Sequence, residues 1–231
     1  MEAIILAGGK AERMGDATGG RPKALVQVAG RPLVAYQVGR LAHAGVSRVI
    51  VSCADGQGEL FERELTGLGT EIVPAEEPER LGRGGGIKFA ARLRQESGEV
   101  LALNGDELVD VDFGALLAAH RSGGALATIT VAQPKSQFGL VQVDDDDVVR
   151  GFEEAGRVPY WVNCGNYVLS EEAITRFPDK GDHESSTFPE LAASGQLRAH
   201  RHEGLWLTVN TPKELRVAQE HVESHPEWLA T

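Results

Sequence analysis

Short apolar runs alternate with helical patterns along the first half of the chain, and this alternation restricts the fold more than any other feature. The runs contain β-branched residues, are typical of buried strands, and cover 3–7, 48–53, 70–74 and 99–103. Segments 32–44 and 57–68 carry apolar residues at helical spacing. Strands joined by helices form right-handed βαβ units. We therefore predict an α/β fold, a Rossmann-like three-layer sandwich with a mainly parallel central sheet.

The second half of the chain predicts a smaller antiparallel region. Runs 126–132, 139–143 and 148–152 are spaced for antiparallel pairing, and we expect them to form an excursion from the main sheet. Segment 197–207 predicts a hairpin that turns at Glu203-Gly204. The length of 231 residues fits a single domain, 1–231, with one half in 1–110 and the other in 111–231.

Charge and composition exclude several classes of partner. The formal net charge of −11 argues against a nucleic-acid surface. No apolar stretch approaches the length of a membrane span, and no basic-then-apolar leader opens the chain. We therefore expect no membrane partner and a cytoplasmic location. The two cysteines, Cys53 and Cys164, are too few for a disulfide framework and are expected to be buried.

The first strand runs into a glycine-rich, cationic loop. Gly8-Gly9 follows the strand, and Lys10, Arg13, Arg21 and Lys23 follow within the next residues. Glycines let backbone N–H groups approach phosphate oxygens, and the cations balance the negative charge. This pattern favours a polyphosphate site over the alternative, an ordinary turn with solvated charges.

An acidic residue follows the strand at 99–103. Asp106 lies in the run Asn104-Gly105-Asp106-Glu107, at the end of a central strand where open α/β sheets bind ligands. A carboxylate opposite a polyphosphate loop is a suitable Mg²⁺ ligand. The alternative is a turn-forming Asp with no ligand.

A second glycine-rich loop, 82–86, follows two carboxylates, Glu76 and Glu77. Either carboxylate could accept hydrogen bonds from the N–H groups of guanine or cytosine. The alternative is a surface loop with a charged fringe.

Several of these stretches together resemble the sugar-1-phosphate nucleotidyltransferases, also called NDP-sugar pyrophosphorylases. The matching stretches are LAGGKAERM (6–14), RPKALV (21–26), RLGRGGGIK (80–88), NGD (104–106), FGLV (138–141), GFEEAG (151–156), WVNCGNYVL (161–169) and WLTVNTPKEL (206–215). The resemblance implies a transferase that joins an NTP to a sugar 1-phosphate, with the antiparallel excursion as the sugar-binding region. It implies that 1–110 mainly binds the nucleotide and 111–231 mainly binds the sugar phosphate.

The resemblance also implies roles for individual residues. The implied nucleotide-binding residues are Leu6, Ala7, Gly8, Gly9, Glu76, Gly82 and Gly105. The implied catalytic residues are Arg13, Lys23 and Asp106, and the implied Mg²⁺ ligands are Asp106 and Asn210. The implied sugar-phosphate-binding residues are Gly139, Glu154 and Asn163. For two of these, structural alternatives stay open: Asn163 as a strand-turn residue and Asn210 as a helix cap.

One position departs from the family pattern. Ala155 stands where many members carry the lysine that meets the sugar phosphate. Lys135 or Arg157 could replace it, or the phosphate could rest on Mg²⁺ and Lys23. This departure affects the prediction of the sugar class more than the prediction of the reaction.

The predicted function is Mg²⁺-dependent nucleotidyl transfer from an NTP to a sugar 1-phosphate. The motifs are most similar to those of mannose- and heptose-1-phosphate guanylyltransferases, which favours GTP. The expected partners are these two substrates and, as one option, a second copy of the chain. Three alternatives stay open: a related transferase with a non-sugar phosphate acceptor, a glycosyltransferase that uses Asp110-Val111-Asp112, and a non-catalytic sugar-nucleotide sensor.

Overall fold

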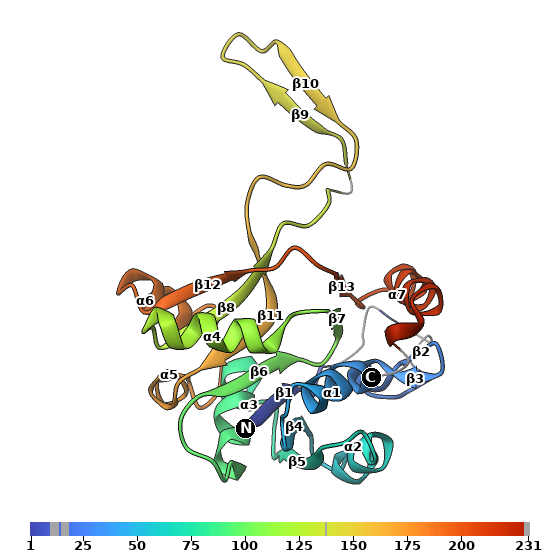
Figure 1. Cartoon of the computed structure of the whole chain (residues 1–231), viewed down its shortest axis with the longest axis vertical. Helices are drawn as coiled ribbons and strands as arrows, with labels where there is room; N and C mark the ends of the chain where they lie inside the picture. The colour runs from blue at the N-terminus through green and yellow to red at the C-terminus, as the bar shows by residue number, and fades with distance from the viewer. Residues whose placement is uncertain (10–13, 15–18, 137, 229–231) are drawn as a thin grey trace.

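The structure is a computed structural model that describes residues 1–9, 14, 19–136 and 138–228. Its centre is a seven-stranded sheet (Figure 1). In spatial order the strands are β12 (Leu197–Arg201), β8 (Ala127–Ala132), β11 (Val162–Leu169), β6 (Val100–Asn104), β1 (Glu2–Leu6), β4 (Arg48–Ala54) and β5 (Glu71–Glu77). Neighbouring strands pair in parallel except at β11, which is antiparallel to both β6 and β8. The predicted mainly parallel α/β sheet is therefore confirmed.

Helices cover both faces of this sheet. They are α1 (Leu33–His43), α2 (Gly58–Leu65), α3 (Gly82–Ala90), α4 (Phe113–Gly123), α5 (Glu171–Arg176) and α6 (Thr187–Ala193), while α7 (Pro212–Ser224) packs against the short strands β2 and β13. Alternate residues of β1 face opposite layers, as strand geometry requires. Ile5 packs in a cluster with residues of α1, α2 and α4, whereas Ile4 packs in another with residues of α3, α5 and α6. The result is the predicted three-layer sandwich.

A short sheet lies beside the main one, and one predicted hairpin was wrong. Lys23–Leu25 forms a 3₁₀ turn, and the two-residue strand β2 (Gln27–Val28) pairs with β3 (Arg31–Pro32). Segment 197–207 is no hairpin, because β12 pairs with β8, while β13 (Trp206–Thr208) pairs with β7 (Glu107–Val109). The local pattern predicts which segments are extended, but distant parts of the chain decide which strands pair.

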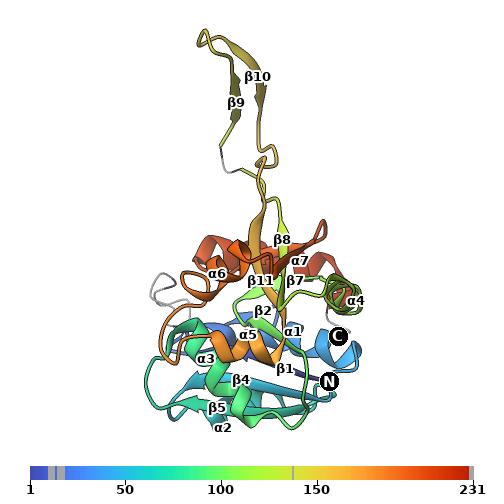
Figure 2. The same cartoon turned by 90° about the vertical axis from the view of Figure 1, so that its left-hand side faces the viewer.

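The antiparallel excursion is smaller than predicted. The run 126–132 became β8 of the main sheet, and only β9 (Leu140–Val143) and β10 (Val149–Glu153) pair as a hairpin. This hairpin projects far from the body in both views (Figures 1 and 2). Its base continues the β8–β11 ladder, with hydrogen bonds of 2.8 Å from Ser136 N to Gly156 O and 3.0 Å from Val158 N to Pro134 O. We call the described residues between 133 and 161 the arm.

Among the described residues, no helix combines the length and the apolar character needed to cross a membrane.

Candidate active site

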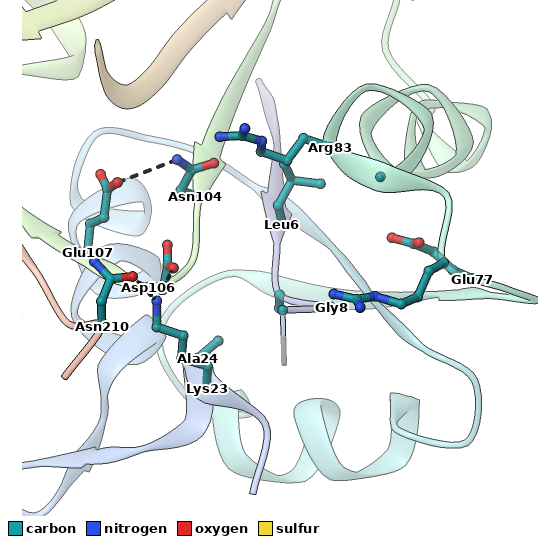
Figure 3. Close-up of a pocket in the computed structure, with 14 residues that line it drawn as sticks. Leu6, Gly8, Lys23, Ala24, Glu77, Arg83, Asn104, Asp106, Glu107 and Asn210 are labelled. Atoms are coloured by element: carbon teal, nitrogen blue, oxygen red, sulfur yellow. Dashed lines mark hydrogen bonds and ion pairs between the residues drawn. The ribbon is translucent and has the colours of Figure 1, made fainter. Parts of the chain in front are cut away.

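A cavity of about 340 Å³ opens beyond the carboxyl ends of β1 and β6 (Figure 3). Open α/β sheets bind ligands at this edge, because loops from neighbouring strands diverge there. Its lining residues are Leu6, Ala7, Gly8, Gly9, Lys23, Ala24, Glu77, Arg80, Gly82, Arg83, Asn104, Asp106, Glu107 and Asn210. Residues from the first loop, the second glycine-rich loop and the loop before α7 thus share one site.

Three of the predicted residues meet inside this cavity. Lys23 Nζ lies 2.5 Å from Asp106 Oδ2 and donates a 2.6 Å hydrogen bond to Asn210 Oδ1. Lys23 is buried and begins the 3₁₀ turn after Pro22, Asp106 lies between β6 and β7, and Asn210 precedes α7. The cap of α7 is Thr211, whose Oγ1 accepts from Glu214 N, so the helix-cap alternative does not explain the Asn210 side chain.

The same geometry tests whether the site suits Mg²⁺. Asp106 and Asn210 bring one carboxylate and one amide oxygen to a single cation, here the Lys23 ammonium. Hard oxygen donors of this kind suit Mg²⁺, which usually keeps several waters and uses one or two protein ligands with substrate phosphates. Within the described residues no group of three acidic, His or Cys side chains forms a complete metal cage. The two oxygens therefore fit a Mg²⁺ that substrate phosphates and water would complete.

Glycine is required at the turn that carries Asp106. A Cβ on Gly105 would lie 2.9 Å from the carbonyl oxygen of Leu6, and Gly105 N donates a 2.9 Å hydrogen bond to that oxygen. Gly105 itself does not line the cavity; it lets the β6–β7 turn approach β1, which brings Asp106 to the cavity. Gly8 and Gly9 line the cavity as predicted, while Lys10 and Arg13 lie outside the described residues.

The structure places Glu77, rather than Glu76, in the cavity wall. Successive side chains of a strand point to opposite faces, so only one of the two can face the site. Glu76 Oε1 instead accepts a 2.6 Å hydrogen bond from Gly58 N at the start of α2. Glu77 accepts hydrogen bonds from Ser52 Oγ at 2.6 Å and Leu81 N at 2.9 Å, which fix it beside the second glycine-rich loop.

Gly82 lines the cavity at the start of α3. Its φ is +76° and a Cβ would lie 2.6 Å from Gly181 O, so both conformation and space require glycine there.

The three predicted sugar-binding residues are not gathered in the cavity. Gly139 and Glu154 belong to the arm, and neither lines the cavity. A Cβ on Gly139 would lie 2.4 Å from the Phe152 ring, which accounts for this glycine by packing within the arm. Asn163, on β11, donates both amide hydrogens internally: 2.8 Å to Tyr167 Oη and 2.9 Å to Glu184 Oε1.

The candidate replacements for the missing lysine also lie in the arm. Lys135 and Arg157 face each other as a bridge in its base, and Arg157 Nη1 donates a 2.9 Å hydrogen bond to Gln133 O. Neither lines the cavity. Asp110 and Asp112 are also engaged elsewhere: Asp110 pairs with His202 at 3.0 Å, and Asp112 caps α4 through Ala115 N at 2.9 Å.

The sequence reasoning missed four polar lining residues: Arg80, Arg83, Asn104 and Glu107. Burial and the neighbouring Asp106 charge raise the pKa of Glu107 to about 8. The acidic pair Asp106-Glu107 at a strand end was the signal that could have identified it. Arg83 pairs with Asp182 and Glu184, whereas Arg80 forms no ion pair with any residue that the structure describes.

Known proteins are similar to this chain over most of its length. The family model described as nucleotidyl transferase matches residues 2–225. Curated relatives include a mannose-1-phosphate guanylyltransferase of Mycobacterium tuberculosis, 33% identical over 93% of this chain and 62% of its own length. Another is mannose-1-phosphate guanyltransferase beta-A of Xenopus laevis, 30% identical over 99% of this chain and 68% of its own. The chain thus spans roughly two thirds of these relatives' length.

Solved structures resemble the whole chain. The crystal structure of HddC from Yersinia pseudotuberculosis has a TM-score of 0.75 at 25% identity, covering 95% of this chain and 98% of its own. A second, described as a putative glucose-1-phosphate thymidylyltransferase of Bacillus anthracis, has a TM-score of 0.77 at 15% identity, covers 96% of this chain and 95% of its own, and shows a shared fold. The family match over nearly the entire length, on a fold whose cavity joins Lys23, Asp106 and Asn210, means that the chain belongs to the nucleotidyl transferase family.

Proposed function

We propose that the protein transfers a nucleotidyl group from an NTP to a sugar 1-phosphate and releases pyrophosphate. The observation that carries this proposal is the convergence of Lys23, Asp106 and Asn210 in a cavity walled by Gly8 and Gly9. The Lys23 ammonium, the oxygens of Asp106 and Asn210 that could hold Mg²⁺, and the backbone of Gly8 and Gly9 together suit a triphosphate better than a neutral ligand.

The reaction needs no nucleophilic side chain. An oxygen of the acceptor phosphate attacks the α-phosphorus in line; the new P–O bond forms as the bond to the pyrophosphate leaving group breaks. Lys23 would neutralise charge on the α-phosphate and the incoming phosphate, and Gly8 and Gly9 would hold the outer phosphates with Arg13. Catalysis of this kind is positioning plus electrostatic stabilisation.

Asp106 and Asn210 would hold Mg²⁺. When bound, the ion would lower the repulsion between the two anionic substrates. Lys23 now bridges both ligands, so we infer that it separates from at least one of them when the ion binds.

We propose GTP as the nucleotide and mannose- or heptose-1-phosphate as the acceptor. Curated relatives are named mannose-1-phosphate guanylyltransferases, and HddC was also solved in complex with GMP-PN. In this reading 1–110 mainly binds the nucleotide and 111–231 mainly binds the sugar phosphate. The substrates of such a reaction, together with two buried free cysteines, support a cytoplasmic location.

We also propose a homodimer formed through the arm. Phe138 and Phe152 are 78% and 67% exposed, and an isolated two-stranded hairpin is marginally stable in water. The hydrogen-bonded base holds the arm away from the body of its own subunit, so these side chains would be buried by a second copy of the chain.

Pyrophosphate release across four NTPs and a panel of sugar 1-phosphates tests the function. A non-sugar phospho-alcohol in the same panel tests the related transferase with another acceptor. We expect release with GTP and a sugar 1-phosphate together. Binding of a sugar nucleotide without any release would instead support the non-catalytic sensor. The glycosyltransferase alternative is disfavoured because Asp110 and Asp112 are held by His202 and α4.

A further inference from the structure

The loop between α5 and α6 lies against the start of α3, and we call its residues 177–184 the clasp. Gly181 N donates a 2.7 Å hydrogen bond to Leu81 O, and Gly181 O accepts from Gly84 N at 3.0 Å and from Gly85 N at 3.3 Å. The first N–H groups of a helix have no partner within the helix. The residue before α3 is Leu81, whose apolar side chain cannot accept a hydrogen bond. The clasp therefore caps α3 from a distant part of the chain.

Close contact with the clasp explains two glycines of α3. A Cβ on Gly84 would lie 2.9 Å from His183 N, and a Cβ on Gly85 would lie 2.5 Å from Asp179 O. Both atoms that the Cβ would meet belong to the backbone, which cannot move aside as a flexible side chain does. These glycines are therefore required by the clasp, without reference to any ligand.

Charges of opposite sign face each other across the same contact. The ion pairs are Arg83–Asp182, Arg83–Glu184 at 2.8 Å, Lys88–Asp179 at 3.0 Å and Lys180–Glu79. Such pairs contribute little individually when they are exposed, but these four join the same two segments. Arg83 also lines the cavity, so Asp182 and Glu184 fix the position of its guanidinium there.

The clasp has its own anchor in the second half of the chain. The His183 ring is fully buried, stacks on Phe177 with 4.7 Å between ring centroids, and meets the edge of Phe188 at 4.6 Å. Glu184 Oε1 accepts a 2.9 Å hydrogen bond from Asn163 Nδ2 on β11. The clasp is thus held by the core and by β11, and it presents its cap to α3 from this fixed base.

We propose that Gly181 and Asp182 are positioning residues that hold the start of α3 where it binds the NTP. The inference rests on the proposed function and deepens it. Gly82 and Arg83 line the cavity, whereas Gly181 and Asp182 do not. Gly181 acts through the backbone N–H groups of α3, and Asp182 acts through Arg83. Residues of the half 111–231 therefore tune nucleotide affinity without lining the cavity themselves.

Gly181→Ala in the whole chain tests the cap. The φ of Gly181 is +142°, which alanine rarely adopts, so the substitution should displace the carbonyl group that caps α3. Calorimetry should show the Kd of GTP with Mg²⁺ rising about 10- to 100-fold, the effect of a small misplacement of binding groups, while the KM of the sugar 1-phosphate stays within about twofold. Hydrogen exchange at the amides of Gly84 and Gly85 should become faster in the same variant.

Gly195→Ala is the matched control. Gly195 also has a positive φ, +70°, and nothing lies within 4 Å of its Cβ position. The control should therefore lose stability through the same kind of backbone strain and leave the Kd of GTP unchanged.

Asp182→Asn tests the ion pair with Arg83 and gives a result even if Gly181→Ala does not fold. Because both side chains are partly exposed, the Kd of GTP should rise by only about two- to fivefold. The difference from the wild type should narrow at about 1 M salt, which screens exposed charges. Glu172→Gln removes a surface carboxylate paired with Arg176 inside α5, and it should leave the Kd of GTP unchanged.

An unchanged Kd of GTP in both clasp variants would overturn the positioning role, and so would an equal rise in Gly195→Ala. Failure of the transferase function is distinguishable. GTP binding that depends on Gly181, with no pyrophosphate release on any acceptor, would refute the transferase and keep the positioning role. Pyrophosphate release by a wild type whose GTP affinity is independent of the clasp would refute the positioning role alone. A wild type that binds no NTP would refute both.

Discussion

The cavity and the arm hold their side chains in opposite ways. In the cavity, Lys23 and Glu107 are 8% and 7% exposed, and each is fixed by partners from other elements. On the arm, Phe138 and Phe152 are 78% and 67% exposed and extend from a two-stranded ribbon. The chemistry of the cavity therefore depends on long-range positioning, whereas the arm extends its aromatic side chains into solvent. Substitutions should therefore damage the two regions in different assays.

The largest expected effect is at Asp106. Asp106→Ala removes the carboxylate that pairs with Lys23 and would hold Mg²⁺, and kcat should fall on the order of 10³-fold, by analogy with a lost oxyanion donor. Circular dichroism should show an unchanged fold, because the side chain is about one-third exposed. Near-normal pyrophosphate release by this variant would contradict the assigned role.

Lys23→Ala should cost about 10²- to 10³-fold in turnover through lost charge neutralisation. It also leaves Asp106 and Asn210 without the cation that now joins them. Mg²⁺ affinity, measured by calorimetry, should therefore be retained or increased. A loss of Mg²⁺ affinity would mean that Lys23 organises the ligands rather than competing with the ion.

Gly105→Ala tests the close approach that positions Asp106. The new Cβ would lie 2.9 Å from Leu6 O, so β1 and the β6–β7 turn must separate. We expect the free energy of unfolding to fall by about 1–3 kcal/mol, the usual cost of overpacking, together with a lower kcat. Gly9→Ala is the matched control, since nothing lies within 4 Å of its Cβ position. Equal stability of the two variants would refute the steric argument.

Substitutions in the arm should weaken association between subunits and leave the stability of the subunit unchanged. Phe138→Ser with Phe152→Ser removes exposed apolar area, so the unfolding free energy of the subunit should change by less than about 0.5 kcal/mol. Analytical ultracentrifugation should show a weaker dimer, by at least about tenfold in Kd for two lost anchors. A wild-type monomer at all concentrations would refute the homodimer.

The smallest expected effect is a pH dependence of stability at Asp110–His202. The Asp110 carboxylate, 3.0 Å from His202 Nε2, raises the pKa of His202; burial acts to raise the pKa of Asp110, but the interaction with His202 outweighs it and the pKa of Asp110 is lowered. His202 therefore stabilises the fold below its unfolded pKa of about 6.5 and loses this contribution as pH rises through its higher folded pKa. Asp110 contributes above its unfolded pKa of about 3.9 and loses this as pH falls.

Both charges are present between about pH 4 and 6.5. The unfolding free energy lost in Asp110→Asn should be largest near pH 5–6 and shrink toward pH 9, as followed by urea denaturation. The effect should stay below about 1 kcal/mol, because the Asp110 side chain is 39% exposed and solvent screens it. If the unfolding free energy lost in Asp110→Asn grew above pH 8, the predicted direction of the pH dependence would be wrong.

Much of the site was predictable because its glycines and charges lie at strand ends. Lys23, Asp106 and Asn210 are far apart in sequence, yet the structure joins them: Asp106 follows β6 at the ligand edge of the main sheet, and the pairing of β13 with β7 brings Asn210 beside it. Glu76 was misplaced because neighbouring residues of a strand face opposite sides, and the sequence does not show which side of β5 faces the cavity. The assigned roles of Lys23, Asp106 and Asn210 stay predictions until they are measured.

The parallel α/β core follows from the amino-acid sequence alone, because apolar runs of strand length alternate with helical patterns and can be buried only between helices. The pairing of the strands depends on long-range contacts: β12 pairs with β8, so the run 197–207 does not close as a hairpin. The tertiary structure also decides that Glu107 and Arg83 share a wall, and that Gly139 and Glu154 leave with the arm. Local patterns fix backbone conformation and burial, whereas the convergence of side chains depends on contacts between segments that are distant in the chain.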